Sequence, residues 1–297
     1  MQLCENNVLE KKDSIIVGRT AGFCYGVKRA IEGAEKEIKN ESKNKIYCLG
    51  EIVHNRQVVS NLEKQGINFI ENLDDADGKT IIRAHGIPKE VYEEAKQNNI
   101  ELVDYTCPNV LKIHKIAEEY SNKGYFVFLC GSKTHPENIG TISYCGKNSY
   151  IIEKEEDSFK ALNKLEKTGI RKLLVISQTT YSIEKFSIIE EIIKNEVPRN
   201  IDLVIKNTIC KATELRQKET EEIAKKVDKM IIIGGKNSSN TRKLYEIALK
   251  NCKDTICIET KEELEIEECK KHKKIGIMAG ASTPQKSIDE VLNILNK

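Results

Sequence analysis

The sequence predicts an α/β protein built from three similar units, each containing a parallel sheet. Two observations predict this fold class. Short apolar runs of strand length alternate with stretches of helical periodicity along the whole chain. In addition, one local pattern, a strand-like run followed by a cysteine and then by a helical stretch, occurs three times, at Cys24, Cys107 and Cys210. A repeated supersecondary pattern indicates an internal structural repeat.

The three copies of this pattern place a cysteine at the turn between a strand and a helix. The first copy leads from residues 15–17 to Cys24, the second passes through Cys107 and the third through Cys210. Pro108 fits the first position of a helix, where no backbone N–H is needed. The free N–H groups and the dipole of a helix start stabilise a thiolate, so this position suits a reactive or metal-bound cysteine.

The other strand-like runs follow one another between helical stretches. In chain order they are 46–49, 80–82, 125–129, 173–176, 230–233, 255–258 and 275–278. The chain has only 5 prolines and no Gly/Ser-rich linker, so we expect the units to pack on one another. The predicted lobes are 26–107, 108–209 and 210–297, with residues 1–25 packing on the third.

Composition excludes several classes of protein. The chain has 297 residues, 39% of them hydrophobic, which is enough for a large core or several small ones. Lys plus Arg number 48 and Asp plus Glu 46, so the charge gives no reason to expect a nucleic-acid partner. No apolar run is long enough to span a membrane and the first residues are too polar for a secretory signal. We therefore expect a cytoplasmic protein, in which ten cysteines do not favour a disulfide framework.

Polar side chains with chemical potential gather just after the predicted strands. Ligands of parallel α/β units bind beyond the carboxyl ends of the strands, so these are the candidate site residues. They are His54, His85, His135, Glu137, Thr179, Ser238, Ser239, Asn240 and Ser282.

The three repeated cysteines allow more than one interpretation. Three thiolates can hold a [4Fe–4S] cluster by three corners and leave one iron open to a substrate hydroxyl group. Three thiolates can also hold zinc. A third alternative is that the cysteines are small apolar residues packed at helix starts.

The segment 234–241, GGKNSSNT, has the composition of an anion-binding loop. Its glycines permit close backbone approach, and its Ser and Asn residues precede a predicted helix whose N-terminus attracts anions. Ser282 repeats this arrangement at the last helix, and His54 and His85 can donate to phosphate oxygens. The pattern favours a phosphate or diphosphate ligand, with simple helix capping as the alternative. GxxxxGK[ST] and GxGxxG motifs are absent, which argues against a P-loop and a Rossmann nicotinamide site.

Glu137 and His135 lie together in the sequence THPEN. A carboxyl group near an open metal can supply protons, and Thr179 could relay a proton or orient a hydroxyl group. The alternative is a turn with a surface glutamate and a histidine bonded to the backbone.

The chain resembles the 4-hydroxy-3-methylbut-2-enyl diphosphate reductase family over nearly its full length. The matching motifs are GFCYGVKRAI, GEIVHN, AHGIP, DYTCP, HPENIGT, SQTT, NTICKAT, GGKNSSNT and AGASTP. The resemblance implies a pseudo-threefold trefoil of three α/β lobes around a central [4Fe–4S] cluster. It implies that Cys24, Cys107 and Cys210 are the cluster ligands and that Glu137 is the proton donor. The implied substrate-binding residues are His54, His85, His135, Thr179, Ser238, Ser239, Asn240 and Ser282.

The activity that this resemblance implies is the last step of the methylerythritol phosphate route to isoprenoids. In that reaction the hydroxyl group of an allylic alcohol diphosphate is removed reductively, which yields isopentenyl diphosphate, dimethylallyl diphosphate and water. The implied electron donor is reduced ferredoxin or flavodoxin. Competing hypotheses are a three-cysteine zinc hydrolase acting on a phosphorylated metabolite, a cluster-bearing redox sensor and a plain three-lobed scaffold.

Overall fold

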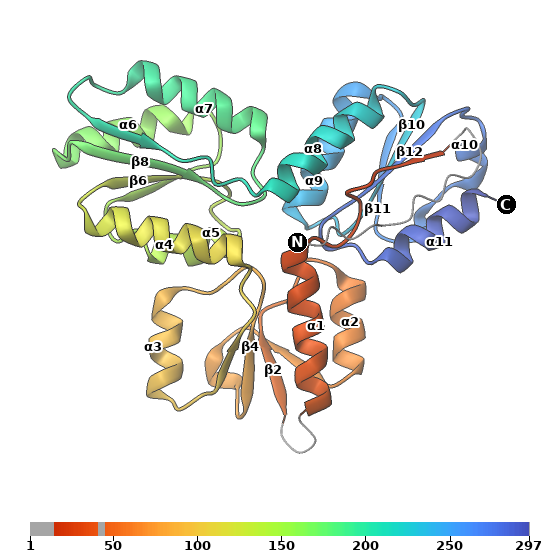
Figure 1. Ribbon diagram of the computed structural model, residues 1–297, viewed down its shortest axis with the longest axis horizontal. Coiled ribbons are helices and arrows are strands. Elements are labelled where there is room, and N and C mark those ends of the chain that lie inside the picture. The colour runs from red at the N-terminus through yellow and green to blue at the C-terminus, as the bar shows by residue number, and fades with distance from the viewer. Residues whose placement is uncertain (1–14, 41–44, 297) are drawn as a thin grey trace, which may run out of the picture. The chain divides into compact units, whose positions relative to one another are not determined.

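In a computed structural model, the chain forms three parallel sheets of four strands each (Figure 1). The structure describes residues 15–40 and 45–296. The prediction of three parallel-sheet α/β repeats is confirmed. The part of the lobe prediction that falls on residues 1–14 lies outside the described residues, and the lobe boundaries themselves stay a prediction.

Contacts divide the chain into two compact units. The first unit contains residues 15–24, 54–58 and 211–296, and the second contains residues 25–53 and 59–210. The elements, in chain order, are β1 (Ile15–Val17), α1 (Tyr25–Asn40), β2 (Ile46–Leu49), α2 (Arg56–Lys64), β3 (Ile67–Ile70), η1 (Leu73–Asp75), β4 (Lys79–Ile82), α3 (Lys89–Gln97), β5 (Leu102–Asp104), α4 (Pro108–Asn122), β6 (Phe126–Cys130), α5 (Pro136–Ser143), β7 (Ser149–Ile152), α6 (Asp157–Thr168), β8 (Lys172–Ser177), α7 (Ile183–Glu196), β9 (Asp202–Ile205), α8 (Lys211–Ala224), β10 (Lys229–Ile233), α9 (Ser239–Asn251), β11 (Thr255–Ile258), η2 (Lys261–Glu263), α10 (Ile266–Lys270), β12 (Ile275–Ala279) and α11 (Gln285–Leu295).

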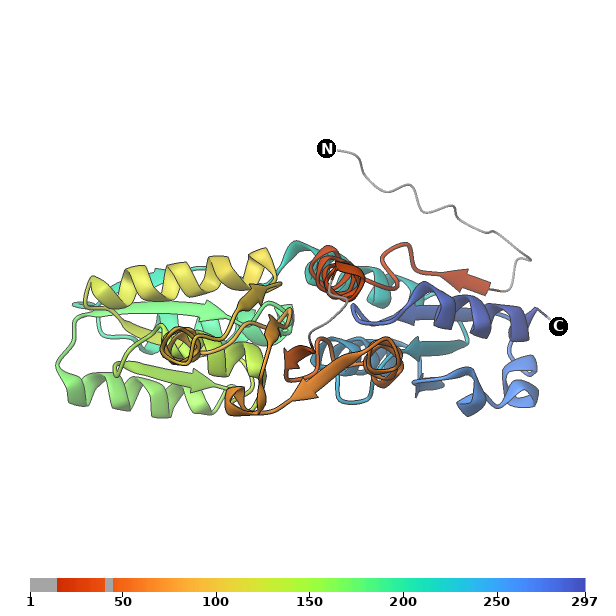
Figure 2. The same cartoon turned by 90° about the horizontal axis from the view of Figure 1, so that it is seen from below.

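The second unit contains two of the sheets. The first has the order β3-β2-β4-β5, with α3 on one face and α1 and α2 on the other (Figure 1). The other has the order β7-β6-β8-β9 and lies between two helical layers (Figures 1 and 2). Phe126 and Phe128 pack toward α6 and α7, whereas Val127 and Leu129 pack toward α4 and α5. Strand β6 is apolar throughout because both faces of a parallel sheet are covered.

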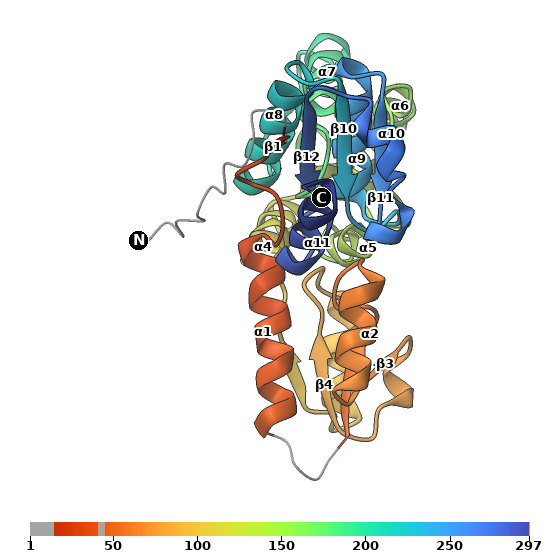
Figure 3. The same ribbon diagram turned by 90° about the vertical axis from the view of Figure 1, so that its right-hand side faces the viewer.

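The first unit contains a sheet with the order β1-β12-β10-β11. Strand β1, from the start of the described chain, pairs in parallel with β12 near its end, with Ile15 opposite Ile275 (Figure 3). Helices α8 and α9 pack together on one face, while α10 and α11 cover the other (Figure 1). This sheet therefore takes its fourth strand from a segment that lies far away in the sequence.

The predicted strands agree with the observed ones to within one residue at each end. The sequence analysis did not single out β3 and β7, which are both edge strands. Each has a partly exposed side, marked by Asn68 in β3 and Ser149 in β7. A strand that buries only part of its surface carries a weaker apolar signal. Among the described residues, no helix has both the length and the apolar character that crossing a membrane requires.

A half-buried ion pair holds the starts of β10 and β11 together. The Lys229 side chain is 6% exposed and contacts Asp254, which is 41% exposed, at 2.8 Å, and His272 contacts the other oxygen of Asp254 at 2.7 Å. We predict that Asp254→Ala lowers the free energy of unfolding by about 1–2 kcal/mol, because it leaves a buried ammonium without its partner while solvent already screens the exposed carboxylate. Urea unfolding measures this loss. Glu267→Ala, which breaks an exposed pair with Lys270, should cost less than about 1 kcal/mol, and equal losses in both variants would contradict the prediction.

Candidate functional site

The three repeated cysteines occupy equivalent places in the fold. Each cysteine follows a strand at the edge of its sheet (β1, β5 or β9), and each directly precedes a helix (α1, α4 or α8). The backbone N–H of each donates to the carbonyl oxygen two residues beyond the end of the neighbouring strand. These bonds are Cys24 N to Ala281 O at 3.2 Å, Cys107 N to Ala84 O at 2.9 Å and Cys210 N to Thr179 O at 3.0 Å.

The remaining described cysteines have a different environment. Burial raises the pKa of the Cys48 and Cys145 thiols to about 12 and that of Cys257 to about 11, and it also raises the pKa of Cys130. Such thiols are poor metal ligands because the thiolate is the ligating form. The three repeated cysteines are only partly buried, as is Cys257.

The first turn of α1 packs directly against the Cys107 sulfur. A Cβ atom on Gly26 would stand 2.5 Å from Cys107 Sγ, so only glycine permits this approach. The three sulfur donors, each at a helix start, fit either of the metal groups considered from the sequence, an iron–sulfur cluster or zinc.

Glu137 is a buried carboxyl group that a single residue holds at both oxygens. It is 2% exposed, and it accepts hydrogen bonds from the backbone N and from Oγ1 of Thr179, each at 2.6 Å. Burial raises its pKa to about 7, against the opposing effect of the two bonds from Thr179. A carboxyl group that titrates near neutrality is suited to general acid–base chemistry.

His135 caps the helix that carries Glu137. Its Nδ1 accepts a hydrogen bond from the backbone N of Glu137 at 3.2 Å. In the neutral ring this bond leaves the proton on Nε2, which can then donate to a ligand. The ring of His85 stands edge-on to that of His135, with their centroids 5.3 Å apart. The second unit therefore brings two histidines together beside the Glu137 helix.

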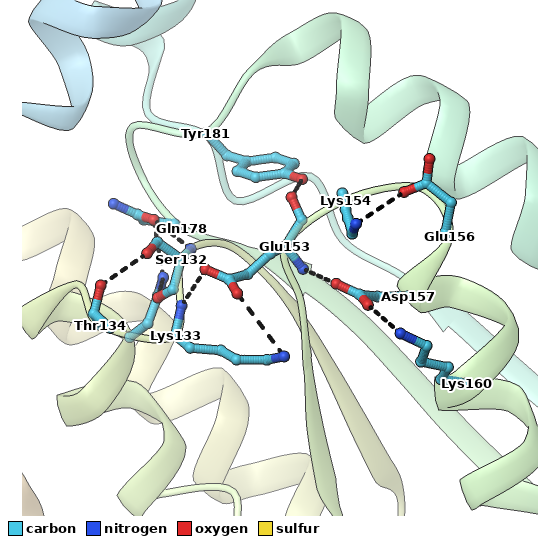
Figure 4. Close-up of polar contacts among 11 residues, drawn as sticks. Ser132, Lys133, Thr134, Glu153, Lys154, Glu156, Asp157, Lys160, Gln178 and Tyr181 are labelled. Atoms are coloured by element: carbon cyan, nitrogen blue, oxygen red, sulfur yellow. Dashed lines mark hydrogen bonds and ion pairs between the residues drawn. The ribbon is translucent and has the colours of Figure 1, made fainter.

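The loop before His135 is braced by side chains that the sequence analysis did not assign. Glu153, just after β7, accepts from the backbone N of Lys133 at 2.9 Å, and Tyr181 donates to its carbonyl oxygen (Figure 4). Gln178 Oε1 accepts from Asn138 Nδ2 at 2.9 Å. Asn138 and Gln178 lie within the motifs HPENIGT and SQTT, next to residues that were predicted for the site. This closeness in the sequence is the signal that could have identified them.

In the first unit, residues 234–238 form a turn and residues 239–241 already belong to helix α9, so the helix begins within the predicted loop. Ser238 caps that helix by accepting from the N of Thr241 at 3.4 Å. The Asn240 side chain is 3% exposed, and neither of its amide atoms has a hydrogen-bond partner within the described part of the chain. An unpartnered buried amide is costly, which indicates a ligand that completes its bonds.

The His54 backbone adjoins both Ser-containing loops of the first unit. Ser282 Oγ donates to His54 O at 3.2 Å. A Cβ atom on Gly235 would lie 2.5 Å from the same oxygen, so the glycine permits close approach. Ser239 is the first residue of α9. Five of the six residues predicted for an anion thus lie in this unit, on its loops and in the first turn of α9, whereas His85 lies in the second unit.

The structure distributes the candidate residues between the two units. The first unit contains Cys24, His54, Ser238, Ser239, Asn240 and Ser282, and the second contains His85, Cys107, His135, Glu137, Thr179 and Cys210. His114, to which we assign no role, is buried and stacks on Tyr144 with ring centroids 4.4 Å apart.

Comparison with known proteins gives consistent matches. A model of the LytB protein family matches residues 15–296. The 4-hydroxy-3-methylbut-2-enyl diphosphate reductase of Thermoanaerobacter sp. (strain X514) is 45% identical over 283 residues, which cover 94% of this chain and 95% of that protein. The enzyme of the same name from Aquifex aeolicus (strain VF5) is 43% identical over 286 residues, with coverage of 93% and 94%.

Solved structures agree with these matches. The E-1-hydroxy-2-methyl-but-2-enyl-4-diphosphate reductase of Plasmodium falciparum has a TM-score of 0.87 and 34% identity, and the match covers 96% of this chain and 88% of that one. A second structure, of an (E)-4-hydroxy-3-methyl-but-2-enyl diphosphate reductase described as the terminal enzyme of the non-mevalonate pathway, has a TM-score of 0.69 and 40% identity. That match covers 95% of this chain and 99% of the other.

Proposed function

Because the chain belongs to the LytB family, we propose that it is the reductase that converts 4-hydroxy-3-methylbut-2-enyl diphosphate to isopentenyl diphosphate and dimethylallyl diphosphate. This is the last step of the methylerythritol phosphate route to isoprenoids. One observation carries the proposal. Thr179 holds the buried carboxyl group of Glu137 with its N and Oγ1, and its carbonyl oxygen accepts from the N of Cys210. A proton donor is thus joined directly to the backbone of a candidate metal ligand.

We propose that Cys24, Cys107 and Cys210 hold one [4Fe–4S] cluster. When bound, such a cluster supplies electrons one at a time and an open iron that polarises a hydroxyl group. The equivalent placement of the three cysteines supports this assignment. Reduced ferredoxin or flavodoxin is the proposed electron donor. We also propose a cytoplasmic location, which suits the described cysteines because none of them forms a disulfide.

The side chains of the second unit provide the proton chemistry. The reaction consumes two electrons from the reduced donor and two protons, breaks one C–O bond, forms one C–H bond and releases water, so one proton leaves with the hydroxyl oxygen and the other is bound to carbon in the product. We propose that protonated Glu137, oriented by Thr179, gives a proton to the departing hydroxyl oxygen. His135 then orients the reacting end of the substrate through Nε2–H.

We propose that the substrate diphosphate is bound by His54, Ser238, Ser239, Asn240 and Ser282 of the first unit, and by His85. The support is the helix start at Ser239, the capping Ser238 and the unpartnered Asn240 amide. Binding energy at the diphosphate aligns the reacting end of the substrate, as remote binding does in other enzymes.

Anaerobic turnover tests the proposal. Protein purified without oxygen is given the hydroxylated diphosphate and a strong one-electron reductant, and both five-carbon diphosphates are measured. Iron and acid-labile sulfide analysis of the same sample separates a cluster from zinc. A protein that contains zinc, or an iron–sulfur protein with no turnover, would overturn the proposal.

The substitution Asn240→Ala should weaken ligand binding without lowering the free energy of unfolding. Removing an amide whose atoms are buried without partners should leave the free energy of unfolding unchanged or raise it. Affinity for inorganic pyrophosphate, measured by calorimetry, should fall about tenfold or more because a ligand contact is lost. Asn251→Ala, at the exposed end of the same helix, is the control and should leave affinity unchanged. Unaltered pyrophosphate binding in Asn240→Ala would remove Asn240 from the site.

A further inference from the structure

The loop that leads to Cys24 is held by helix α8 of the same unit. Arg216, on that helix, is 3% exposed. Its Nε donates to the carbonyl oxygen of Thr20 and its Nη2 to that of Gly22, each at 2.8 Å. One guanidinium group therefore fixes two carbonyl groups of the chain just before Cys24.

Glu219, one turn further along α8, holds the N–H groups of the same loop. It accepts from the backbone N of Arg19 at 2.7 Å and from that of Thr20 at 2.8 Å, and also from Thr20 Oγ1. A cation and an anion on one helix face thus hold the carbonyl and the amide groups of residues 19–22. Charge-assisted hydrogen bonds of this kind are stronger than neutral ones.

Burying the charged Arg216 side chain costs desolvation free energy that an apolar side chain on the same helix face would not cost. The buried side of α8 also contains Thr213, Thr220 and Ile223, and apolar packing at position 216 would avoid the desolvation of a charge. In some proteins a buried charged group fixes one particular arrangement, and the segment that Arg216 contacts here is the loop before Cys24.

The second unit contains a partial parallel. Arg29, on the helix that follows Cys24, donates to the carbonyl oxygen of Thr106 at 3.2 Å, directly before Cys107. The loop before Cys210 is held differently, by the hydroxyl of Thr208 bonded to Ser177. Side-chain hydrogen bonds thus hold all three cysteine loops, and Arg216, which holds the Cys24 loop, is the most buried of the three residues that hold them.

We propose that Arg216, together with Glu219, is a positioning residue for Cys24. The pair holds residues 19–22 so that the Cys24 sulfur is in place for the metal group without further ordering of the loop. The inference rests on the proposed function only in taking Cys24 as a ligand. The double contact requires the fork of a guanidinium group, which a lysine ammonium does not provide.

Backbone hydrogen exchange tests the positioning role without reference to activity. The full chain, purified anaerobically, is compared before and after removal of iron by chelation, for the wild type, Arg216→Met, Arg216→Lys and Glu219→Gln. Amides of residues 18–24 should exchange about tenfold to hundredfold faster in the Arg216 variants, because charged hydrogen bonds are lost. Amides of β10 should keep their wild-type rates. Lys218→Met, which removes an exposed cation from the same helix, is the control and should match the wild type.

Iron and sulfide content after anaerobic reconstitution provides the second readout. We expect Arg216→Met and Arg216→Lys to retain less than half of the wild-type iron, and the lysine variant to give no rescue. Wild-type exchange and iron content in Arg216→Met would overturn the proposal, as would equal acceleration of exchange in β10. If Arg216→Met does not fold, Glu219→Gln decides by the same criteria. If the loop exchanges faster in the Arg216 variants but the wild type binds no iron, then Arg216 still holds the loop and the proposed function is refuted instead.

Discussion

Glu137→Gln is expected to lower turnover by about 10²–10⁴-fold, the usual contribution of a general acid, while iron content and substrate affinity stay close to the wild type. Glutamine has almost the same shape but no acidic proton. Its amide oxygen can accept from the backbone N–H of Thr179, and its NH₂ group can donate to Thr179 Oγ1, because a hydroxyl group also accepts hydrogen bonds. The buried position should therefore be retained and the proton lost. Single-turnover kinetics under anaerobic conditions measures the effect.

The same substitution should change how stability depends on pH. Burial raises the pKa of Glu137 from its ordinary 4.5 to about 7 in the folded protein. Between these values the folded state holds a proton that the unfolded chain releases, so the wild type loses stability as pH rises through this window. Glu137→Gln cannot lose a proton there. Its stability relative to the wild type should increase from about pH 4.5 to 7, as urea unfolding at several pH values would show.

An exposed glutamate provides the control for both measurements. Glu166→Gln, on α6, makes the same chemical change on the surface and should leave turnover and its pH dependence unaltered. A near-normal rate in Glu137→Gln would remove Glu137 as the proton donor. A flat stability difference across the same pH window would show that the carboxyl group is not protonated in the folded state.

Local sequence predicted the parts of this fold that depend on local chemistry. Apolar strands such as 46–49 and 255–258 are fully specified by their own residues, and the observed β2 and β11 coincide with them. Each repeated cysteine stands at a helix start for the same reason, because the strand, the turn and the helix signals are adjacent in the sequence. The roles assigned to the candidate site residues stay a prediction.

Contacts between distant segments could not be read from the sequence. The prediction that residues 1–25 pack on the third lobe does not say which strand they join, because any parallel neighbour would suit a short β-branched run such as 15–17, which pairs with β12. Arg216 lies in a charged stretch that reads as a solvated helix face, yet it is buried because its partners are carbonyl groups almost two hundred positions away. His114 also lies between charged residues, and burial lowers its pKa to about 4.

Cys107→Ser is expected to abolish the metal group or reduce it severely, and with it all turnover. A serine hydroxyl group is a poor replacement for a thiolate at iron. Iron and sulfide analysis, together with the absorption spectrum of anaerobically purified protein, measures the loss.

Cys257→Ser separates loss of a ligand from loss of any partly buried thiol. Cys257 is, like Cys107, neither fully buried nor fully exposed, but burial raises the pKa of its thiol to about 11 and so keeps it protonated. It should therefore tolerate serine with unaltered iron content. An intact and active metal group in Cys107→Ser would refute its role as a ligand. Equal loss of iron in both variants would mean that replacing any partly buried cysteine disturbs the metal group. A place at the start of a helix would then not identify the metal ligands.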